Sequence, residues 1–284
     1  MSYFPPSIFR HFFYRDFEMP ITCNIPLRNL NQEEFGPLAY SVLGDVYRIH
    51  NELGRYFDEQ IYKRALGSCR PDVRLEEPIS ISFRTFHTHC KLDVLVGDGG
   101  VFEFKAAESF SPRHKAQLIH YLHLAGLSRG LLVNVRTEHV EHHFVNAPLA
   151  RDERYQFVPR LRNWDSSVPA AAFLHDTLLD MLADWGTGLE LPLYDEALIH
   201  FLGGLDFVVR PADVQFQDRN IWRQDFRHAA ENVVFKLTAF EDDESLDNFE
   251  KHARRLLDHT SLTALIWANI GRRVVTFSTL RKKA

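Results

Sequence analysis

One predicted hairpin, DVLVGDGGVFEFKAA at residues 93–107, carries charged side chains where a structural strand would carry neutral ones. Because side chains alternate between the two faces of a strand, Glu103 and Lys105 share one face, while Phe102 and Phe104 occupy the other. The phenylalanine face is typical of a core. A purely structural strand would more often fill the opposite face with Thr, Val or Tyr, so this face is a candidate for chemistry that needs an acid and a cation side by side.

The turn of this hairpin decides whether Asp93 joins the charged face. A three-residue loop over 97–99, with Gly99 in the left-handed conformation, would place Asp93 directly opposite Glu103. A two-residue turn would instead pair Asp93 with Phe104 and send the acid to the other side of the sheet. We expect the three-residue loop, or a bulge with the same effect.

Two helices are predicted ahead of the hairpin. Residues 31–53 have a helical apolar period, with Asn31 as the N-cap and Glu34 at the capping-box position. Gly54 should end this helix, and residues 58–67 predict a second, shorter one. The apolar period means that one face of the first helix belongs to the core.

The segments around the hairpin predict the rest of an α/β module. Residues 73–86 alternate as a strand does, and Pro78 favours a position at a sheet edge. Residues 111–126 predict a helix, and 129–135 a continuously apolar strand covered on both faces. The resulting order is helix, a three-stranded antiparallel part, helix and strand, in a compact module that ends near residue 147.

The composition is that of an ordinary globular protein. The 284 residues are 45% hydrophobic and 25% charged, and the net charge of -5 argues against an indiscriminate nucleic-acid binder while leaving room for a local basic groove. Cys23, Cys69 and Cys90 lie far apart, which excludes a disulfide framework and suits a reducing compartment. No apolar run reaches the length of a membrane span and no signal-peptide pattern is present, so we expect a cytoplasmic protein without a membrane partner.

Three stretches of the first half resemble, in order and spacing, the GxxExxY family of the PD-(D/E)XK nuclease superfamily. They are VYRIHNELGRYFDEQIYKRAL, KLDVLVGDGGVFEFKA and HKAQLIHYLHLAGLSRGLLVNV, within residues 46–135. Tyr56 replaces the glycine that names the family, whereas Glu59 and Tyr62 are kept. The resemblance implies a PD-(D/E)XK nuclease-like core and Mg²⁺-dependent hydrolysis of phosphodiester bonds, with DNA favoured over RNA as the nucleic-acid partner.

The resemblance also assigns catalytic roles to individual residues. Asp93 and Glu103 would be metal-binding carboxylates, Lys105 the catalytic lysine and Glu59 the helix-borne acid. Together with the backbone carbonyl of Phe104, the two carboxylates could hold Mg²⁺, which keeps several waters and needs few protein ligands. Mn²⁺ is the expected substitute. A metal-activated water would then attack the phosphodiester, and the lysine would stabilise the developing charge.

Further residues would position the substrate. Gln117 and Tyr121 match the QxxxY pair of the family and lie one helical turn apart, and His114 lies one turn before Gln117. Five cations could form a basic approach despite the acidic total: Arg64, Arg70, Arg74, Arg84 and Lys91.

Each of these residues also has a structural explanation. Glu103 and Lys105 could be an exposed ion pair, and Gln117 and Tyr121 a surface position and a core-edge aromatic. The fifteen histidines include several close groups, but none has a clear third ligand at metal-binding spacing. The combined match of three segments is what favours the catalytic interpretation.

The second half repeats patterns of the first. Residues 186–198 share Gly, Tyr, Ala and Leu with residues 54–66 at the same spacing, and VFEFKAAE is followed later by VVFKLTAFE. This predicts a degenerate second copy, in which Lys236 matches Lys105 while Val234 stands in the place of Glu103. Such a copy would lack the catalytic carboxylates and would supply an interface or a substrate wall.

The expected organisation therefore has four parts. Residues 1–30 would form an N-terminal arm, 31–147 the nuclease-like domain, 148–169 a linker and 170–284 a second α/β domain. A duplicated chain would act as a monomer with internal pseudo-symmetry, and a homodimer is the alternative.

Two other functions compete with the nuclease. The acidic net charge, the substituted glycine and the incomplete second half favour a catalytically inactive nuclease-fold protein that acts as a binding or assembly module. A hydrolase of another phosphoester is the third possibility. A continuous positive groove over Asp93 and Glu103 would favour the nuclease, and an acidic closed face the binding module.

Overall fold

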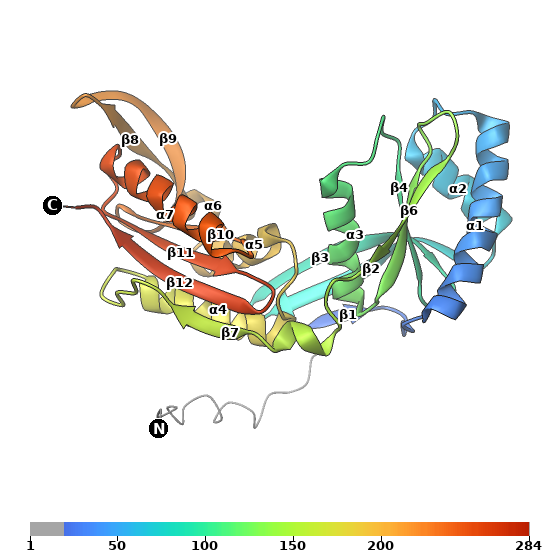
Figure 1. Ribbon diagram of the computed structural model, residues 1–284, viewed down its shortest axis with the longest axis horizontal. Coiled ribbons are helices and arrows are strands. Elements are labelled where there is room, and N and C mark those ends of the chain that lie inside the picture. The colour runs from blue at the N-terminus through green and yellow to red at the C-terminus, as the bar shows by residue number, and fades with distance from the viewer. Residues whose placement is uncertain (1–19, 284) are drawn as a thin grey trace.

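The computed structural model describes residues 20–283 and contains two six-stranded sheets in two halves (Figure 1). The first sheet consists of β1 (Ile21–Cys23), β2 (Val73–Phe83), β3 (Phe86–Val96), β4 (Gly100–Lys105), β5 (Arg129–Asn134) and β6 (Glu141–Asn146), in that spatial order. Only β4 and β5 pair in parallel in this sheet; the other neighbours are antiparallel. The predicted α/β class is confirmed.

The first helix, α1 (Gln32–Leu53), begins and ends where the sequence predicts. The Asn31 side chain accepts a hydrogen bond from the Glu34 N–H at 3.0 Å, and the Glu34 carboxylate accepts one from the Asn31 N–H at 2.9 Å. Gly54 follows with φ of 76°, a conformation that favours glycine. The capping box and the glycine therefore set both ends of this helix.

The second and third helices flank the hairpin. The second, α2 (Glu59–Cys69), runs two residues past the predicted end at Gly67. The third, α3 (Pro112–Ala125), has the predicted Pro at its first position and ends at Gly126, which is left-handed with φ of 66°. Figure 1 shows α1 and α2 on the outer side of the first sheet and α3 on the side that faces the second half.

Two apolar cores hold the first sheet between these helices. Phe102 and Phe104 of β4 point into a core shared with α1 and α2, whereas Val101 points into the core that includes α3. Strands β4 and β5 are buried on both faces, which explains their continuous apolar sequence. This alternation leaves Glu103 and Lys105 on the side of the sheet covered by α3.

The edge of the sheet differs slightly from the sequence expectation. Strand β1 pairs with Ile79–Ile81 of β2, so β2 is covered there by one more short strand. Pro78 lies just outside the covered stretch, where its missing N–H costs nothing. Most of the predicted N-terminal arm, residues 1–19, lies outside the described residues, and its end supplies β1.

The second half contains its own helices and sheet. Its elements are η1 (Asp152–Tyr155), β7 (Val158–Leu161), α4 (Ala171–Trp185), α5 (Leu191–Phe201), α6 (Leu205–Val208), β8 (Val209–Phe216), β9 (Arg219–Ala230), β10 (Val233–Thr238), α7 (Asp243–Asp258), β11 (Ala264–Ile270) and β12 (Val274–Arg281). The sheet order is β7-β12-β11-β10-β9-β8. The segment expected as an irregular linker thus includes η1 and β7, and β7 pairs in parallel with β12.

The two halves share an order of elements. In each, a pair of helices (α1 and α2, or α4 and α5) precedes an antiparallel hairpin, and the second half adds the one-turn α6 between them. A third strand is then linked through one helix to a parallel neighbour (β4 to β5, and β10 to β11). A hydrogen bond also recurs: the Tyr62 hydroxyl donates to the Gly54 carbonyl, and the Tyr194 hydroxyl donates to the Gly186 carbonyl at 2.5 Å. These repeated features support the predicted relation between the halves.

An asparagine clip recurs at the end of the parallel pair. Asn134 of β5 accepts a hydrogen bond from the Ala107 N–H at 3.2 Å and donates to the Ala107 carbonyl at 2.8 Å. Asn269 of β11 forms the same two bonds with Phe240, at 2.7 and 2.9 Å. The clip provides a fixed point for comparing the strands of the two halves.

This fixed point corrects the sequence comparison of β4 with β10. The two asparagines pair across the sheet with Lys105 and with Thr238. Thr238 therefore occupies the position of Lys105, and Lys236, rather than Val234, occupies that of Glu103. The match of Lys236 with Lys105 was shifted by two residues, a shift that preserves the face of every side chain and so escapes a pattern-based comparison.

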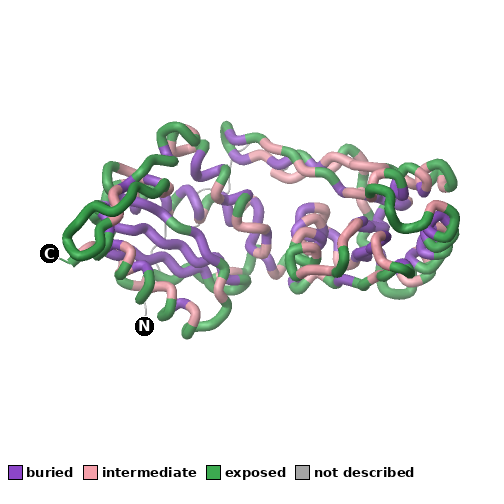
Figure 2. The backbone as a smooth tube through the Cα atoms, turned by 90° about the horizontal axis from the view of Figure 1, so that it is seen from above, coloured by how far each residue is buried: buried purple, intermediate pink, exposed green. Residues whose placement is uncertain are grey.

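The halves meet at the tip of the β2–β3 hairpin. Phe83 and Phe86 pack against Trp185 at ring-centroid distances of 5.9 and 6.0 Å, and the Trp185 Nε1–H donates to the Ser82 carbonyl at 2.9 Å. One continuous apolar core thus crosses the junction. Figure 2 shows buried backbone in the interior of both halves and exposed backbone along their outer loops.

A buried arginine reinforces the same junction. Arg154 is 2% exposed and donates hydrogen bonds to the carbonyls of His123 and Thr187 at 2.6 and 2.8 Å, and at 2.5 Å to that of Trp185. These carbonyls belong to the end of α3, the end of α4 and the segment between α4 and α5.

None of the helices between residues 20 and 283 combines the length and apolar character that a membrane crossing needs.

Candidate active site

The register of the β3–β4 hairpin brings Asp93 and Glu103 together as the sequence predicts. Val94 pairs with Phe102 and Val96 pairs with Gly100, with three residues in the loop between. Continued by one residue, this register sets Asp93 opposite Glu103. The two carboxylates therefore occupy the same face of the sheet.

The loop differs from the prediction in its glycine conformation. Gly97, with φ of 64°, is the left-handed residue, whereas Gly99 is not. Gly99 is needed for space, because a Cβ there would lie 2.0 Å from the Arg28 carbonyl oxygen. The Arg28 N–H donates to the Asp98 carbonyl at 2.7 Å, so the chain preceding α1 packs directly on the loop.

Asp93 has two partners that hold its carboxylate in place. Its Oδ2 accepts a hydrogen bond from the Phe104 N–H at 2.8 Å, where the strand ladder would otherwise continue. Its Oδ1 forms an ion pair with Lys63 of α2, whose side chain is 2% exposed. The side chain of Asp93 thus ties α2, β3 and β4 together.

Lys63 is a site residue that the sequence reasoning missed. It lies four residues after Glu59, on the same face of α2, and one residue after Tyr62. A lysine on a helix is ordinarily a surface residue, so its burial had no signal of its own in the sequence. Its spacing from Glu59 was the one available hint.

Glu103 is almost completely buried, with 2% of its surface exposed. Its Oε1 accepts a hydrogen bond from Lys105 Nζ at 2.6 Å, while its Oε2 is buried without a hydrogen-bond partner in the described chain. Burial raises the pKa of Glu103 to about 7, the charge of Asp93 adds to this, and Lys105 opposes it. The free oxygen is an unusual feature for a buried acid and points to an absent partner.

The helix α3 brings Gln117 and Tyr121 toward the same acids. The Gln117 side-chain amide donates to the Tyr121 hydroxyl at 3.1 Å. Burial is the main cause that raises the pKa of Tyr121, and the charges of Glu103 and Asp93 contribute to it. The predicted pair therefore faces the two carboxylates.

His114 and Glu59 lie at the border of the site. The His114 Nδ1 accepts a hydrogen bond from the Ser111 N–H at 3.2 Å, so its ring caps α3. Burial lowers the pKa of His114, Lys105 lowers it further, and Glu59 opposes the shift. Glu59, the first residue of α2, also adds to the raised pKa of Glu103. Both residues thus act electrostatically on the charged face, and neither contacts Asp93 through a hydrogen bond.

The donor set suits a hard cation with few protein ligands. Between residues 20 and 283 there is no group of three or more His, Cys, Asp and Glu side chains arranged to hold a metal. Asp93 and Glu103 form a pair, and the unpartnered Oε2 of Glu103 is the kind of oxygen that Mg²⁺ accepts alongside several waters. Lys63 and Lys105 neutralise the pair in this structure.

The predicted basic approach is largely neutralised by acids. Arg70 pairs with Asp45 and Asp72, Arg84 with Asp180, and Lys91 with Glu76. Arg74 donates to the Gly97 carbonyl at 2.9 Å. Of the five cations, only Arg64 forms neither an ion pair nor a side-chain hydrogen bond within the described chain, and it is exposed on α2. Acids thus offset the charge of three of these five residues.

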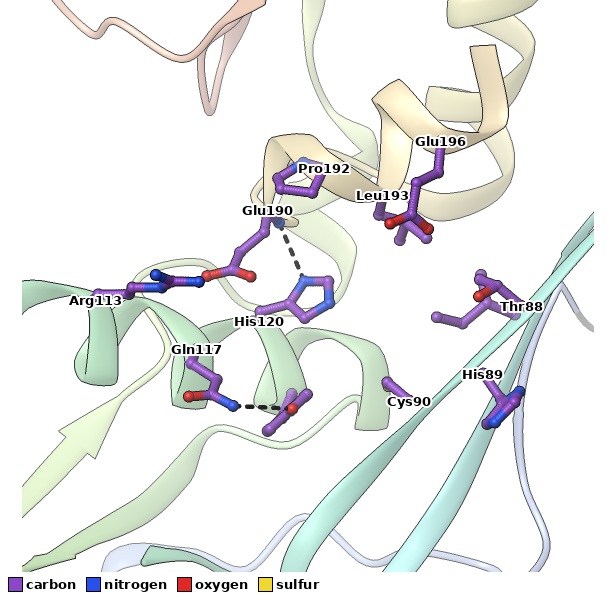
Figure 3. Close-up of a pocket in the computed structure, with 12 residues that line it drawn as sticks. Thr88, His89, Cys90, Arg113, Gln117, His120, Glu190, Pro192, Leu193 and Glu196 are labelled. Carbon is purple, nitrogen blue, oxygen red and sulfur yellow. Dashed lines mark hydrogen bonds between the residues drawn. The ribbon is translucent and has the colours of Figure 1, made fainter. Parts of the chain in front are cut away.

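A pocket of about 300 Å³ adjoins the site at the junction of the halves (Figure 3). Gln117 and Tyr121 line it from α3, and the N-cap Glu190 and Glu196 line it from α5. In Figure 3, Arg113 extends toward Glu190. The pKa of Glu190 is raised by burial, which Arg113 opposes. The pocket offers a polar recess next to the paired carboxylates.

The comparison with protein families agrees with this geometry. Residues 37–145 match the family model of the PD-(D/E)XK nuclease superfamily. This part of the chain is therefore similar to PD-(D/E)XK nucleases in sequence. The matched residues include most of α1 and all of α2, the charged hairpin and α3, so the match covers Asp93, Glu103 and Lys105.

Comparisons with curated proteins and with solved structures do not extend this match. No curated protein is significantly similar to the chain. One solved structure, described as the crystal structure of SSO0001, is similar at 21% sequence identity with a TM-score of 0.27. The similarity covers 43% of this chain and 62% of that one, so the chain spans less than two thirds of that structure.

Proposed function

We propose that the protein is a metal-dependent nuclease that hydrolyses phosphodiester bonds of DNA or RNA, with DNA as the favoured substrate. The main support is the pairing of Asp93 with Glu103 beside Lys105, because the buried Oε2 of Glu103 has no hydrogen-bond partner among residues 20–283. The superfamily match over the same residues adds independent support. We also assign this domain to the GxxExxY family, on the sequence resemblance alone.

The metal site would consist of Asp93, Glu103 and the carbonyl of Phe104. Mg²⁺ bound there, or Mn²⁺ in its place, would supply an activated water and neutralise the phosphate. The carboxylate of Asp93 is already oriented by the Phe104 N–H, so little reorganisation is needed to present it.

Lys105 and Lys63 have different tasks in this proposal. Lys105 has a side chain 15% exposed and lies at the open end of β4, where it can stabilise negative charge that develops on the phosphate. Lys63 is buried beneath Asp93, where it can orient that carboxylate and cannot reach a substrate readily. Lys105 is thus the catalytic lysine, and Lys63 a positioning residue.

The α3 residues would hold the substrate. Gln117 and Tyr121 lie between the paired carboxylates and the junction pocket, so a nucleotide next to the scissile phosphate can contact them. His114 and Glu59 border the same face and would tune its charge. This arrangement leaves the amide of Gln117 available to hydrogen-bond a sugar or a phosphate oxygen.

We further propose that the second half, about residues 170–284, is a degenerate copy of the domain formed by residues 31–147. The shared order of elements, the two Tyr–Gly hydrogen bonds and the two asparagine clips support this relation. A chain that contains both copies would act as a monomer with internal pseudo-symmetry.

One observation favours a second candidate function, a catalytically inactive binding or assembly module. Lys63 forms an ion pair with Asp93. Arg70, Arg84 and Lys91 are also paired with acids, which weakens the attraction of the site for a polyanion. An inactive protein would show neither metal-dependent cleavage nor metal binding.

A cleavage assay tests the proposal. Single- and double-stranded DNA and RNA are incubated with the wild type, Asp93→Ala and Lys105→Ala, with Mg²⁺, Mn²⁺ or EDTA. Cleavage that requires metal and is lost in both variants supports the proposal. Cleavage that survives in both variants contradicts this site, and a folded wild type that cleaves nothing and binds no metal supports the binding module.

A further inference from the structure

The second half contains a larger cavity, of about 520 Å³, between β9, β10 and α7. Its wall is largely apolar and includes Phe226, Phe249, Ala253 and Leu265. The cavity lies on the α7 side of the second sheet, because Phe226, Val234 and Phe249 belong to the core that packs under that helix. It is separate from the junction pocket beside the candidate active site.

The cavity occupies the place in the second half that the charged face occupies in the first. Lys236 lines it, and the asparagine clip puts Lys236 at the position of Glu103. Val234 pairs with His228, and the same register continued by two residues sets Phe226 opposite Lys236, as Asp93 is set opposite Glu103. Both carboxylates are thus replaced, one by a cation and one by an aromatic ring.

The covering helix follows the same correspondence. His252 is ten residues after the N-cap Asp242 of α7, and Tyr121 is ten residues after the N-cap Ser111 of α3. His252 also lines the cavity. Tyr121 and His252 thus hold the same position in their helices. This position carries a hydroxyl group next to the candidate metal site in the first half and an imidazole in the cavity of the second half.

The exchange reverses the charge of the site. Lys236 is exposed and forms no direct hydrogen bond or ion pair within residues 20–283. Burial raises the pKa of Asp195, and the charges of Arg227 and Lys236 oppose this, so Asp195 lies near enough to interact with both cations. Arg227 also lines the cavity, although Asp195 holds it at 3.1 Å. The one acid in the lining is Asp225, on an exposed part of β9. Asp195 offsets part of this positive charge, so the group that the lining offers to an anion is chiefly the exposed ammonium group of Lys236, where the first half has the carboxylate of Glu103.

The apolar wall indicates what accompanies the anion. Phe226 and Phe249 line the cavity, and Phe249 is held against Trp267 at a ring-centroid distance of 4.5 Å. A fixed aromatic ring is a surface on which a nucleobase can pack. A phosphate group near Lys236 and a base near the two phenylalanines would use both parts of the lining.

We propose that this cavity binds a nucleotide, with its phosphate at Lys236 and its base against Phe226 and Phe249. The ligand is either a free nucleotide or the phosphorylated end of a nucleic-acid strand, which share this chemistry. The proposal rests on the correspondence of the two halves and does not require the first half to cleave anything. The second half would then be a substrate- or product-binding site rather than an inert remnant.

The test is calorimetric titration in EDTA, which prevents cleavage, with nucleoside monophosphates and with short 5′-phosphorylated and unphosphorylated oligonucleotides. Lys236→Gln should weaken binding by about tenfold, because a hydrogen bond to a charged group is lost. Lys251→Gln is the matched control, since Lys251 is exposed on α7 and does not line the cavity. Ala253→Leu, which fills the cavity without changing charge, should also weaken binding.

The results separate the two ligand sources and the two proposals. Binding of monophosphates identifies a free-nucleotide site, and binding of phosphorylated oligonucleotides alone identifies a strand end. The inference is overturned if the wild type binds none of these ligands, or if Lys236→Gln and Lys251→Gln have equal effects. Loss of cleavage in Asp93→Ala with unchanged nucleotide binding would leave this inference intact.

Discussion

Lys63 of α2 forms an ion pair with Asp93 of β3, and both side chains are largely buried. A second pair, between Lys105 and Glu103, lies beside it with a donor–acceptor distance of 2.6 Å. The site therefore contains two acids and two lysines with little access to water. Removing one charge from such a cluster leaves an uncompensated partner, which makes the cluster accessible to stability measurements.

The first prediction concerns Lys63→Met. Without the lysine, the carboxylate of Asp93 is left without its ion-pair partner next to the buried Glu103, so the free energy of unfolding in EDTA should fall by about 3–5 kcal/mol. A divalent cation would replace the lost charge. Mg²⁺ or Mn²⁺ should thus raise the unfolding temperature of the variant more than that of the wild type, as measured by calorimetry.

Lys115→Met is the control for this experiment, because Lys115 is exposed on α3. Its unfolding temperature should differ little from that of the wild type, with or without metal. A Lys63→Met protein that is as stable as the wild type in EDTA would show that the buried pair has no part in holding the site together.

The sequence predicted the hairpin well because register is a discrete property. A loop of odd length fixes which face carries Asp93, and the alternation of Phe102, Glu103 and Phe104 then leaves one arrangement that buries the aromatics. Lys63 escaped prediction because a helical lysine has no periodic signal that distinguishes a buried partner from a surface residue. Its burial depends on the distance between α2 and β3, which only the packed structure defines.

The second prediction compares equivalent tyrosines in the two halves. Tyr62→Phe and Tyr194→Phe each remove a hydrogen bond to a glycine carbonyl, and each should cost about 1–2 kcal/mol. The larger loss is expected at Tyr194, whose hydrogen bond is fully buried. Urea unfolding of the two variants measures both values, and the relation between the halves predicts losses of the same sign and similar size.

A different outcome would count against the shared role of these tyrosines. If Tyr62→Phe destabilised the protein and Tyr194→Phe did not, the two hydrogen bonds would be similar in geometry without being equivalent in the fold. Tyr40→Phe, at an exposed position on α1, is the control for the loss of a hydroxyl group alone.

The third prediction concerns acid pH and the junction of the halves. His120 accepts a hydrogen bond from the Glu190 N–H at 3.1 Å, and His123 bonds the Gly188 carbonyl at 2.8 Å. Burial lowers the pKa of each histidine to about 4. In the unfolded chain each would titrate near its usual value of 6.5, so the unfolded state binds more protons between pH 6.5 and 4.

The stability contributed by these histidines should be complete above pH 6.5 and should be lost as the pH falls toward 4. The loss is on the order of 3 kcal/mol for each histidine. Unfolding temperatures measured across this range test the prediction. His123→Gln should flatten the dependence, whereas His139→Gln, at an exposed position, should leave it unchanged. An equal slope in all three proteins would contradict it.

The role of the second half was harder to predict than that of the first. The spacing of Gly186 and Tyr194 was visible in the sequence, and the structure shows the hydrogen bond behind it. The position of Lys236 was not, because a shift of two residues along a strand keeps the same face and the same apolar pattern. Only the asparagine clip, which depends on contacts across the sheet, fixes the alignment.

The pairing of the predicted basic residues with acids was missed for a related reason. Arg70, Arg84 and Lys91 are cations in the sequence, but each has an acidic partner that lies at least fifteen residues away in the chain or comes from another element. A count of charges cannot show such pairing. The electrostatic field around the site is therefore a property of the folded chain rather than of its composition.

The most direct test of the active site is Mn²⁺ binding and nucleic-acid cleavage measured on the same samples of wild type, Glu103→Gln and Asp98→Asn. Asp98 is the matched control, because it lies in the loop of the same hairpin and its exposed side chain pairs only with Arg28. We predict that the wild type and Asp98→Asn bind Mn²⁺ and cleave, whereas Glu103→Gln does neither. Cleavage and Mn²⁺ binding that persist in Glu103→Gln would contradict the assignment of Asp93 and Glu103 as the metal-binding pair.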